Sequence, residues 1–246
     1  MKTTGNTILI TGGSAGIGFA LAQRFIAEGN HVIITGRNKE RLDAAVKQLG
    51  GKVKGIAADV SDVTEVGSLV HRIKTDFPDL NVLINNAGQA YYYKLNESAD
   101  AYTKAEHEML VNYLSVIRLT EKLLPVLQKQ TEAAVVNVSS IVAFVPGATL
   151  PTYAASKAAL HSYSQSLRHV LRDSAVKVFE LMPPLVNTDF SKEIGGESGI
   201  APSVLADDLI GAFASDTYEI HTGITAMIYE LSKSDYTAAF NAMNAD

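Results

Sequence analysis

The sequence predicts an α/β fold, in which a doubly wound parallel sheet carries helices on both faces. Three observations support this fold class. Short apolar or β-branched segments alternate with helix-like segments, the short segments are continuous apolar runs, and a glycine-rich turn follows the first of them. A strand covered on both faces needs apolar side chains on both, so these runs indicate a sheet that is buried on both sides.

The elements follow one another in a βαβ rhythm. The predicted strands are 7–11, 31–35, 52–58, 80–85, 133–139 and 175–182. The predicted helices are 16–28, 38–49, 62–76, 104–129 and 152–172. No internal repeat and no linker rich in Pro, Gly and Ser divides the chain, so we expect a single domain over residues 1–246.

Two long connections interrupt this rhythm, one at 89–103 after the fourth predicted strand and one at 187–203 after the sixth. In a doubly wound sheet, ligands bind beyond the carboxyl ends of the strands. Both connections leave such ends, so we expect them to form the walls of a substrate cleft. No residue pattern within them points to a particular substrate.

Composition excludes several function classes. The chain has 246 residues, 47% of them hydrophobic, and its 21 basic and 26 acidic residues give a net charge of −5 without a basic block that would bind nucleic acid or an anionic membrane. Cysteine is absent, which removes disulfides and thiolate chemistry. The six histidines show no metal-binding spacing, so no metal site is expected. Without a signal peptide or a long apolar segment, a cytoplasmic protein is expected.

The turn after the first strand suits a dinucleotide. Gly12 permits a tight turn, Gly16 lets a phosphate approach the backbone, and Gly18 lets the following helix pack against the strand. An isolated turn of this kind can also be a merely tight connection. Its position between the first strand and the first helix favours dinucleotide binding and a Rossmann-type sheet.

The end of the second strand predicts which dinucleotide is bound. A carboxylate at this place holds the ribose hydroxyls of NAD(H), whereas here the chain continues with Gly36, Arg37 and Asn38. A guanidinium binds phosphate with charge-assisted hydrogen bonds. We therefore expect NADP(H) in preference to NAD(H), with Arg37 on the 2′-phosphate; the alternative is that Arg37 is only a solvated residue ahead of the next helix.

Tyr153 and Lys157 are four residues apart and share one face of the predicted helix 152–172. A nearby ammonium, together with a cationic nicotinamide, would lower the pKa of the phenol and suit it to general acid–base work. Ser140 could donate a hydrogen bond to a substrate carbonyl oxygen. Ser139 competes for this role, and strand alternation should let only one of the two serines reach the substrate. The alternative to a catalytic role is that Tyr153 and Lys157 are ordinary residues of an amphipathic helix.

Taken in order, these motifs resemble the short-chain dehydrogenase/reductase family. They are the Thr-Gly-x-x-x-Gly-x-Gly pattern at 11–18, Asn-Asn-Ala-Gly at 85–88, and Tyr153 with Lys157, preceded by Ser140 at the family's usual distance. The resemblance implies that Asn112, otherwise only a polar residue on a helix, holds a water linked to Lys157. It also implies a set of cofactor contacts. These are Gly12, Ser14, Gly16, Ile17, Gly18, Arg37, Asn38, Asp59, Val60, Asn86, Ala87, Gly88, Tyr153, Lys157, Val186 and Thr188.

Two features depart from the common family pattern. Pro184 stands where the family commonly has glycine, and proline has no N–H to donate, which weakens the expected roles of Val186 and Thr188 at the nicotinamide. The chain also ends in helix-like stretches from Ile224 onward instead of a glycine-rich tail. These two departures resemble the subgroup named after DltE.

The leading hypothesis is an NADPH-dependent carbonyl reductase, or the reverse alcohol dehydrogenase, with Tyr153, Lys157, Ser140 and Asn112 as its catalytic set. The alternatives are an NADP(H)-binding sensor or scaffold protein without turnover, and a related isomerase or dehydratase on the same fold. The family resemblance further implies a homodimer or homotetramer that acts on a small carbonyl or alcohol substrate.

Overall fold

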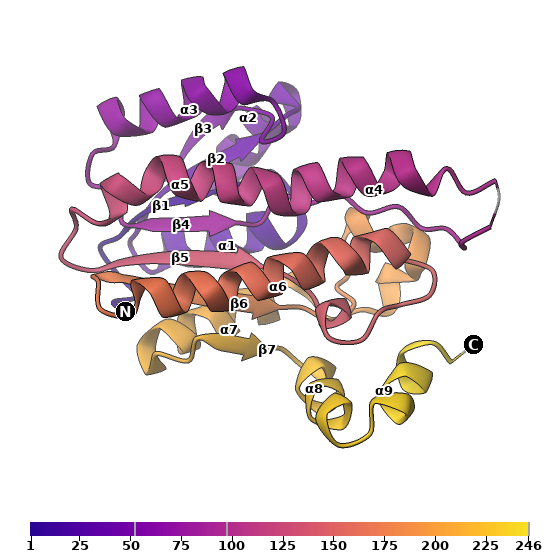
Figure 1. Ribbon diagram of the computed structural model, residues 1–246. Coiled ribbons are helices and arrows are strands. Elements are labelled where there is room, and N and C mark those ends of the chain that lie inside the picture. The colour runs from indigo at the N-terminus through magenta and orange to yellow at the C-terminus, as the bar shows by residue number, and fades with distance from the viewer. Residues whose placement is uncertain (52, 97, 246) are drawn as a thin grey trace.

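A parallel sheet runs through the molecule in the computed structural model, which describes residues 1–51, 53–96 and 98–245 (Figure 1). The described strands are ordered β3-β2-β1-β4-β5-β6-β7, and each pairs in parallel with its neighbours. Their bounds are β1 Thr7–Ile10, β2 His31–Gly36, β3 Val53–Ala57, β4 Val82–Asn85, β5 Ala133–Val138, β6 Val176–Met182 and β7 Glu219–His221. The predicted doubly wound α/β fold, with its Rossmann-type sheet, is therefore confirmed. Lys52, Glu97 and Asp246, which belong to the predicted strand 52–58, the predicted loop 89–103 and the chain end, lie outside the described residues.

Helices follow the strands as the sequence predicts, with two differences. The helices are α1 Gly16–Ala27, α2 Lys39–Leu49, α3 Val63–Asp76, α4 Ala101–Met109, α5 Ser115–Leu127, α6 Pro151–Leu171, α7 Pro202–Ser215, α8 Ile224–Ser234 and α9 Tyr236–Met243. The predicted helix 104–129 begins three residues earlier and contains a π-helical turn, Leu110–Leu114, between α4 and α5. Helix α7 and strand β7 were not predicted. The second long connection, predicted as 187–203, ends two residues earlier, because α7 begins at Pro202. Proline is favoured at the first position of a helix.

Two apolar cores cover the two faces of the sheet. Along β1, Ile8 and Ile10 point into a core shared with α1, α2 and α7. Leu9, between them, points into the opposite core, to which α3 and α5 contribute most of the helical side chains. Successive strand residues thus alternate between two buried faces, which is why the strands are continuous apolar runs.

The last two helices lie outside these layers, beyond the β7 edge of the sheet (Figure 1). Ile228 of α8 and Ala239 of α9 join a third, smaller apolar cluster with Ile141, Val142 and other residues near the start of α6. This hairpin therefore brings the helical chain ending, which the sequence predicts, back to the carboxyl ends of β5 and β6.

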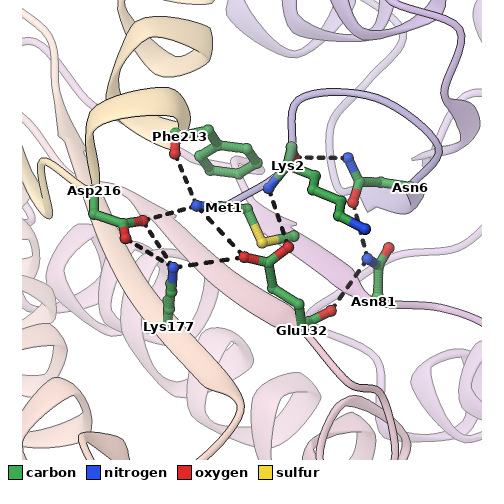
Figure 2. Close-up of polar contacts among 8 residues, drawn as sticks. All are labelled: Met1, Lys2, Asn6, Asn81, Glu132, Lys177, Phe213 and Asp216. Atoms are coloured by element: carbon green, nitrogen blue, oxygen red, sulfur yellow. Dashed lines mark hydrogen bonds and ion pairs between the residues drawn. The ribbon is translucent and has the colours of Figure 1, made fainter.

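Polar contacts close the opposite end of the sheet, before the strands begin (Figure 2). The amino group of Met1 donates to the Phe213 carbonyl at 2.9 Å and to Asp216 Oδ1 at 2.8 Å. Lys177 Nζ lies 2.9 Å from the same carboxylate and 3.5 Å from Glu132 Oε1. These ion pairs connect the end of α7 with the starts of β5 and β6, far from the carboxyl ends of the strands. In the described part of the chain, no helix has the length and apolar character needed to cross a membrane.

Gly12 in the turn between β1 and α1, and Gly18 at the start of α1, each have a structural reason to be glycine. Gly12 has a φ of +65°, in the left-handed region that favours glycine. A Cβ atom at Gly18 would lie 2.4 Å from the Gly12 carbonyl oxygen and 2.5 Å from Asn86 Nδ2. The first contact is with backbone, so no side-chain rotation can relieve it.

Replacing Gly18 with alanine should therefore lower the free energy of unfolding by roughly 2 kcal/mol or more, because the added methyl group overpacks a rigid turn. Gly67→Ala is a matched control, since Gly67 lies in the exposed part of α3 with nothing within 4 Å of an added Cβ. The control should raise stability by about 0.5–1 kcal/mol through helix propensity. Urea unfolding measures both values, and equal stability of the two variants would contradict the packing argument.

Candidate active site and dinucleotide cleft

A cleft of about 580 Å³ opens at the carboxyl ends of the strands. It begins at the glycine turn, passes the ends of β4 and β5, and reaches the start of α6. Most of residues 183–194, except Asn187 and Lys192, form its other wall together with Met243. The cleft lies where the strand order reverses between β1 and β4, the place where such sheets bind ligands. A second cavity, of about 470 Å³, lies at the other end of the sheet and contains none of the predicted site residues.

The glycine turn presents an open helix start to this cleft. Gly12, Gly16 and Ile17 line it. Ala15 precedes α1 without a side-chain cap, and the first turn of α1 has no acidic residue. The first N–H groups of a helix have no partner within it and carry partial positive charge, so this end suits a phosphate group. These residues fit a dinucleotide cofactor.

Asn86 holds this turn against the end of β4. Its side-chain Nδ2 donates to the carbonyl oxygens of Thr11 at 2.9 Å and Gly12 at 3.2 Å. In return, the Thr11 hydroxyl accepts hydrogen bonds from the backbone N–H groups of Asn86 and Ala87, both at 3.0 Å. Asn86, Ala87 and Gly88 all line the cleft. The two segments that the resemblance assigns to the cofactor are thus one hydrogen-bonded unit.

The residues predicted at the adenosine end surround the end of β2 but do not line the cleft. Arg37 is 58% exposed, and its Nη1 lies 3.9 Å from Asp59 Oδ2. Asn38 caps α2 by accepting the Arg41 N–H at 2.8 Å, and Asp59 Oδ1 accepts the Ser61 N–H at 2.8 Å. The other predicted residues away from the cleft lining are Ser14, Gly18, Val60 and Asn112.

Arg41 lines the cleft, although sequence reasoning did not select it. Its Nη2 donates to Asp189 Oδ2 at 2.8 Å, so it joins the start of α2 to the segment after β6. The sequence offered one signal for Arg41: it lies in the first turn of α2, four residues after Arg37.

The predicted catalytic side chains converge on the cleft. Tyr153, Lys157 and Ser140 all line it, and Lys157 Nζ lies 5.6 Å from the centre of the Tyr153 ring. Lys157 is buried and donates to the Val138 carbonyl at 2.8 Å. Burial lowers the pKa of Lys157 to about 8, and the charge of Glu180 opposes this change.

Ser139 and Ser140 both border the cleft, but the Ser139 hydroxyl oxygen is buried without a hydrogen-bond partner among the described residues, while the Ser140 hydroxyl shares a hydrogen bond with Tyr153. The expectation that one serine reaches the substrate stays a prediction. Strand β5 ends at Val138, before both serines, so the turn after the strand sets the difference between them. Ser140 begins a 3₁₀ turn, Ile141–Ala143, and its hydroxyl accepts the Val142 N–H at 3.3 Å.

Burial raises the pKa of Tyr153 above the ordinary tyrosine value, against the direction expected from Lys157. A hydrogen bond with Ser140 lowers this pKa, while the charge of Glu108 raises it further. The phenol is thus protonated near neutral pH and can act as a proton donor.

Asn112 lies on the π-helical turn between α4 and α5 and is fully buried. Its Oδ1 accepts the Gln89 N–H at 2.8 Å, while Nδ2 donates to the Gln89 carbonyl at 2.8 Å and to Ser156 Oγ at 2.9 Å. A Cβ at Gly88 would lie 3.5 Å from Asn112 Oδ1 and 3.9 Å from Lys157 Nζ, so both side chains end next to this glycine. Single π-helical turns are frequent at functional sites.

Two buried carboxyl groups near the site were not predicted. Glu108 on α4 is fully buried; it accepts the Tyr91 N–H at 2.7 Å, and burial raises its pKa. Glu180 on β6 is also fully buried, and its Oε2 lies 2.9 Å from His161 Nδ1 on α6. Burial lowers the pKa of His161, but the hydrogen bond and charge of Glu180 outweigh it, so this pKa is raised. His161 follows Lys157 by one helical turn.

The segment after β6 covers the glycine turn. Val186 and Thr188 line the cleft, and a Cβ at Gly16 would lie 3.2 Å from Thr188 Cγ2. Ser191 Oγ donates to the Val186 carbonyl and lies 3.1 Å from Thr188 Oγ1. Pro184, which replaces the family's common glycine, lines the cleft as well. Over the ranges 1–51, 53–96 and 98–245, no group of three or more His, Asp and Glu side chains is arranged to hold a metal ion.

Comparisons with known proteins agree with this geometry. Residues 6–198 match the family model described as short chain dehydrogenase. The oxidoreductase DltE of Bacillus subtilis is 37% identical over 249 residues, covering 99% of this chain and 98% of the relative.

Two solved structures are also similar to the chain. A short chain dehydrogenase from Burkholderia cenocepacia, solved in complex with NADP, has a TM-score of 0.88 at 26% identity and covers 100% of both chains. A 3-ketoacyl-(acyl-carrier-protein) reductase from Brucella melitensis, complexed with NADH, has a TM-score of 0.78 at 26% identity, with coverage of 86% of this chain and 91% of that chain. The DltE-like resemblance and the fold are thereby confirmed.

The His161–Glu180 pair predicts a pH dependence of stability. Because the folded-state pKa of His161 is raised, the stabilisation by this pair is complete below the unfolded value of about 6.5 and is lost as pH rises through the folded-state pKa. Glu180→Gln should therefore cost roughly 1–2 kcal/mol at about pH 6 and less at about pH 9. Chemical denaturation at both pH values measures this, with Glu197→Gln at an exposed position as the control. A cost that is the same at both pH values would contradict the assignment.

Proposed function

The chain belongs to the short-chain dehydrogenase family, and we propose that it is an NADP(H)-dependent oxidoreductase that interconverts a carbonyl compound and the corresponding alcohol. The observation that carries this proposal is the convergence of Tyr153, Lys157 and Ser140 on the cleft that begins at the glycine turn. A phosphate-binding helix start and a proton donor in one cleft are what hydride transfer to a carbonyl requires.

The residues divide the work between binding and proton transfer. When bound, NADP(H) supplies or accepts the hydride. During reduction, Tyr153 Oη gives its proton to the carbonyl oxygen, and Ser140 Oγ donates a hydrogen bond to the same oxygen as negative charge develops there. Lys157 Nζ, whose pKa of about 8 keeps it largely protonated at neutral pH, stabilises the phenolate that remains. In alcohol oxidation the same groups act in reverse.

Asn112 has a positioning role in this proposal. Its side chain is tied to both backbone groups of Gln89 and to Ser156, so it fixes the loop after β4 beside Lys157. Asn86, through Thr11 and Gly12, similarly fixes the segment that carries Ala87 and Gly88. The cofactor contacts proposed for these loop residues depend on this fixed backbone.

The proposed preference for NADP(H) depends on Arg37. Strand β2 ends at Gly36 without a carboxylate of its own, and among the described residues the exposed Arg37 side chain makes one ion-pair contact, a long one with Asp59. A guanidinium so weakly held is available to a phosphate group. Asn38, with its backbone at the start of α2, is the second proposed contact at this end.

Tyr153→Phe should reduce the rate of NADPH-dependent carbonyl reduction by at least about 100-fold, because general acid–base groups contribute roughly 10²–10⁴ to such rates. Binding of NADPH should be unchanged, since the phenol ring remains. Tyr102→Phe is the matched control, as Tyr102 is 79% exposed on α4. Steady-state turnover with a panel of aldehydes and ketones, and NADPH titration, separate the two effects. Unchanged turnover in the Tyr153 variant would refute the proton-donor role, and NADPH binding with no turnover of any substrate by the unaltered protein would favour the sensor hypothesis.

Arg37→Ala should weaken NADPH binding by about 10- to 100-fold, the value of one or two charge-assisted hydrogen bonds. NADH lacks the 2′-phosphate, so its affinity should stay within about twofold and serves as the internal control. Isothermal titration of both nucleotides to both proteins measures the difference. An equal loss for the two nucleotides would mean that Arg37 supports the fold and does not bind the phosphate.

A further inference from the structure

The part of the cleft beyond Tyr153 and Ser140 carries a group of apolar side chains beside a few polar ones, among them Thr149 and Glu193. It is formed by three segments that are distant in the sequence: the turn after β5 with the start of α6, the segment after β6, and the chain end. Its apolar side chains are Val142, Leu150, Leu185, Phe190, Ile194 and Met243. The Phe190 ring lies 6.2 Å from the Tyr153 ring, centre to centre, and Phe190 is 53% exposed. An exposed aromatic ring beside a proton donor is available to pack against a substrate.

The charges at the cleft do not favour an anionic substrate. Arg41 and Asp189 neutralise each other across a 2.8 Å contact, and Lys157 is buried with its ammonium on the Val138 carbonyl. Among the described residues that line the cleft, Glu193 and the buried Lys157 are the charged side chains without an ion-pair partner, and Lys157 belongs to the reacting end of the cleft. A carboxylate or phosphate on the substrate would therefore meet an apolar wall and a like charge.

The chain end supplies a wall that is held in place. Asn244 Nδ2 donates to the Pro146 carbonyl at 3.0 Å, and Asn244 Oδ1 accepts the Ala148 N–H at 2.5 Å. These bonds tie the end of α9 to the turn that precedes α6. Met243, next to Asn244, packs with Tyr153 against the small apolar cluster of α8 and α9 and lines the cleft. A flexible thioether chain at this position adapts to apolar groups of different shape.

We propose that the substrate is an uncharged aldehyde, ketone or corresponding alcohol that carries an apolar chain or ring, and that Met243 is a specificity-determining residue for that group. This proposal rests on the function proposed above, because it places the reacting oxygen at Tyr153 and Ser140. The apolar group then extends between Phe190 and Met243, away from the glycine turn.

The test compares two ligands of equal length, 1-octanol and 8-hydroxyoctanoate, with the protein in complex with NADP⁺. Titration calorimetry measures binding, and NADPH formation measures turnover. We expect 1-octanol to bind at least about tenfold more tightly, because only the carboxylate must be desolvated against an apolar wall. Equal binding, or tighter binding of 8-hydroxyoctanoate, would overturn the proposal.

Variants of Met243 test whether this side chain decides the preference. Met243→Glu should weaken 1-octanol binding by about three- to tenfold through lost apolar contact, and Met243→Lys should strengthen 8-hydroxyoctanoate binding by about fivefold through charge attraction. Met227→Glu and Met227→Lys are matched controls, since Met227 lies on α8 in the same hairpin and is 61% exposed. Identical effects of the substitutions at positions 227 and 243 would show that Met243 does not determine ligand preference.

The two readouts separate this inference from the proposed function. If 1-octanol binds preferentially and through Met243 but no NADPH forms, the result supports the apolar subsite and contradicts the oxidoreductase function. If turnover favours 8-hydroxyoctanoate, the result supports the oxidoreductase function and contradicts the apolar subsite.

Discussion

The contact between the turn after β1 and the end of β4 is the constraint on which the cleft depends. Gly18 approaches the Gly12 carbonyl so closely that a methyl group cannot be placed between them, and Asn86 bonds to the same carbonyl. This contact presents the uncapped start of α1 to the cleft and also fixes the course of the chain into Ala87 and Gly88. Since β1 and β4 are the strands at which the order reverses, one contact shapes both sides of the proposed nucleotide site.

The catalytic half of the cleft depends on buried polar groups that have partners. Asn85 donates to Asn137 at 2.9 Å, and Asn137 donates to Ser164 at 2.9 Å, so β4, β5 and α6 are joined beneath the site. Lys157 bonds to the end of β5, and one turn later His161 pairs with Glu180 on β6. Buried polar groups are costly unless satisfied, and these bonds therefore fix the orientation of α6, on which Tyr153 lies. The half of the cleft at the glycine turn differs, because its shape depends on glycines that have no side chain to fill it.

Much of the site could be predicted because its motifs are local. The glycine turn, Asn86 to Gly88, and Tyr153 with Lys157 are each set by spacing within one turn or one helix, and each lies where its motif predicts. What the sequence could not predict is the surroundings that come from elsewhere in the chain. Strand β5 ends at Val138, so the turn after it, and not strand alternation, sets the surroundings of Ser139 and Ser140. Lys157 and a cationic nicotinamide were expected to lower the pKa of Tyr153, whereas burial of the phenol in this structure raises it.

By itself, the sequence determined the fold class, the positions of the first six strands along the chain, the glycine turn and the pairing of a phenol with an ammonium, because short periodic patterns and glycine positions carry this information locally. Only the tertiary structure decided what surrounds these groups. Glu108, Glu180 and Met243 lie 45 residues before, 27 after and 90 after Tyr153, and no local pattern relates them to it. The fold brings them together because the parallel sheet gathers all its carboxyl ends at one edge and the α8–α9 hairpin returns to that edge.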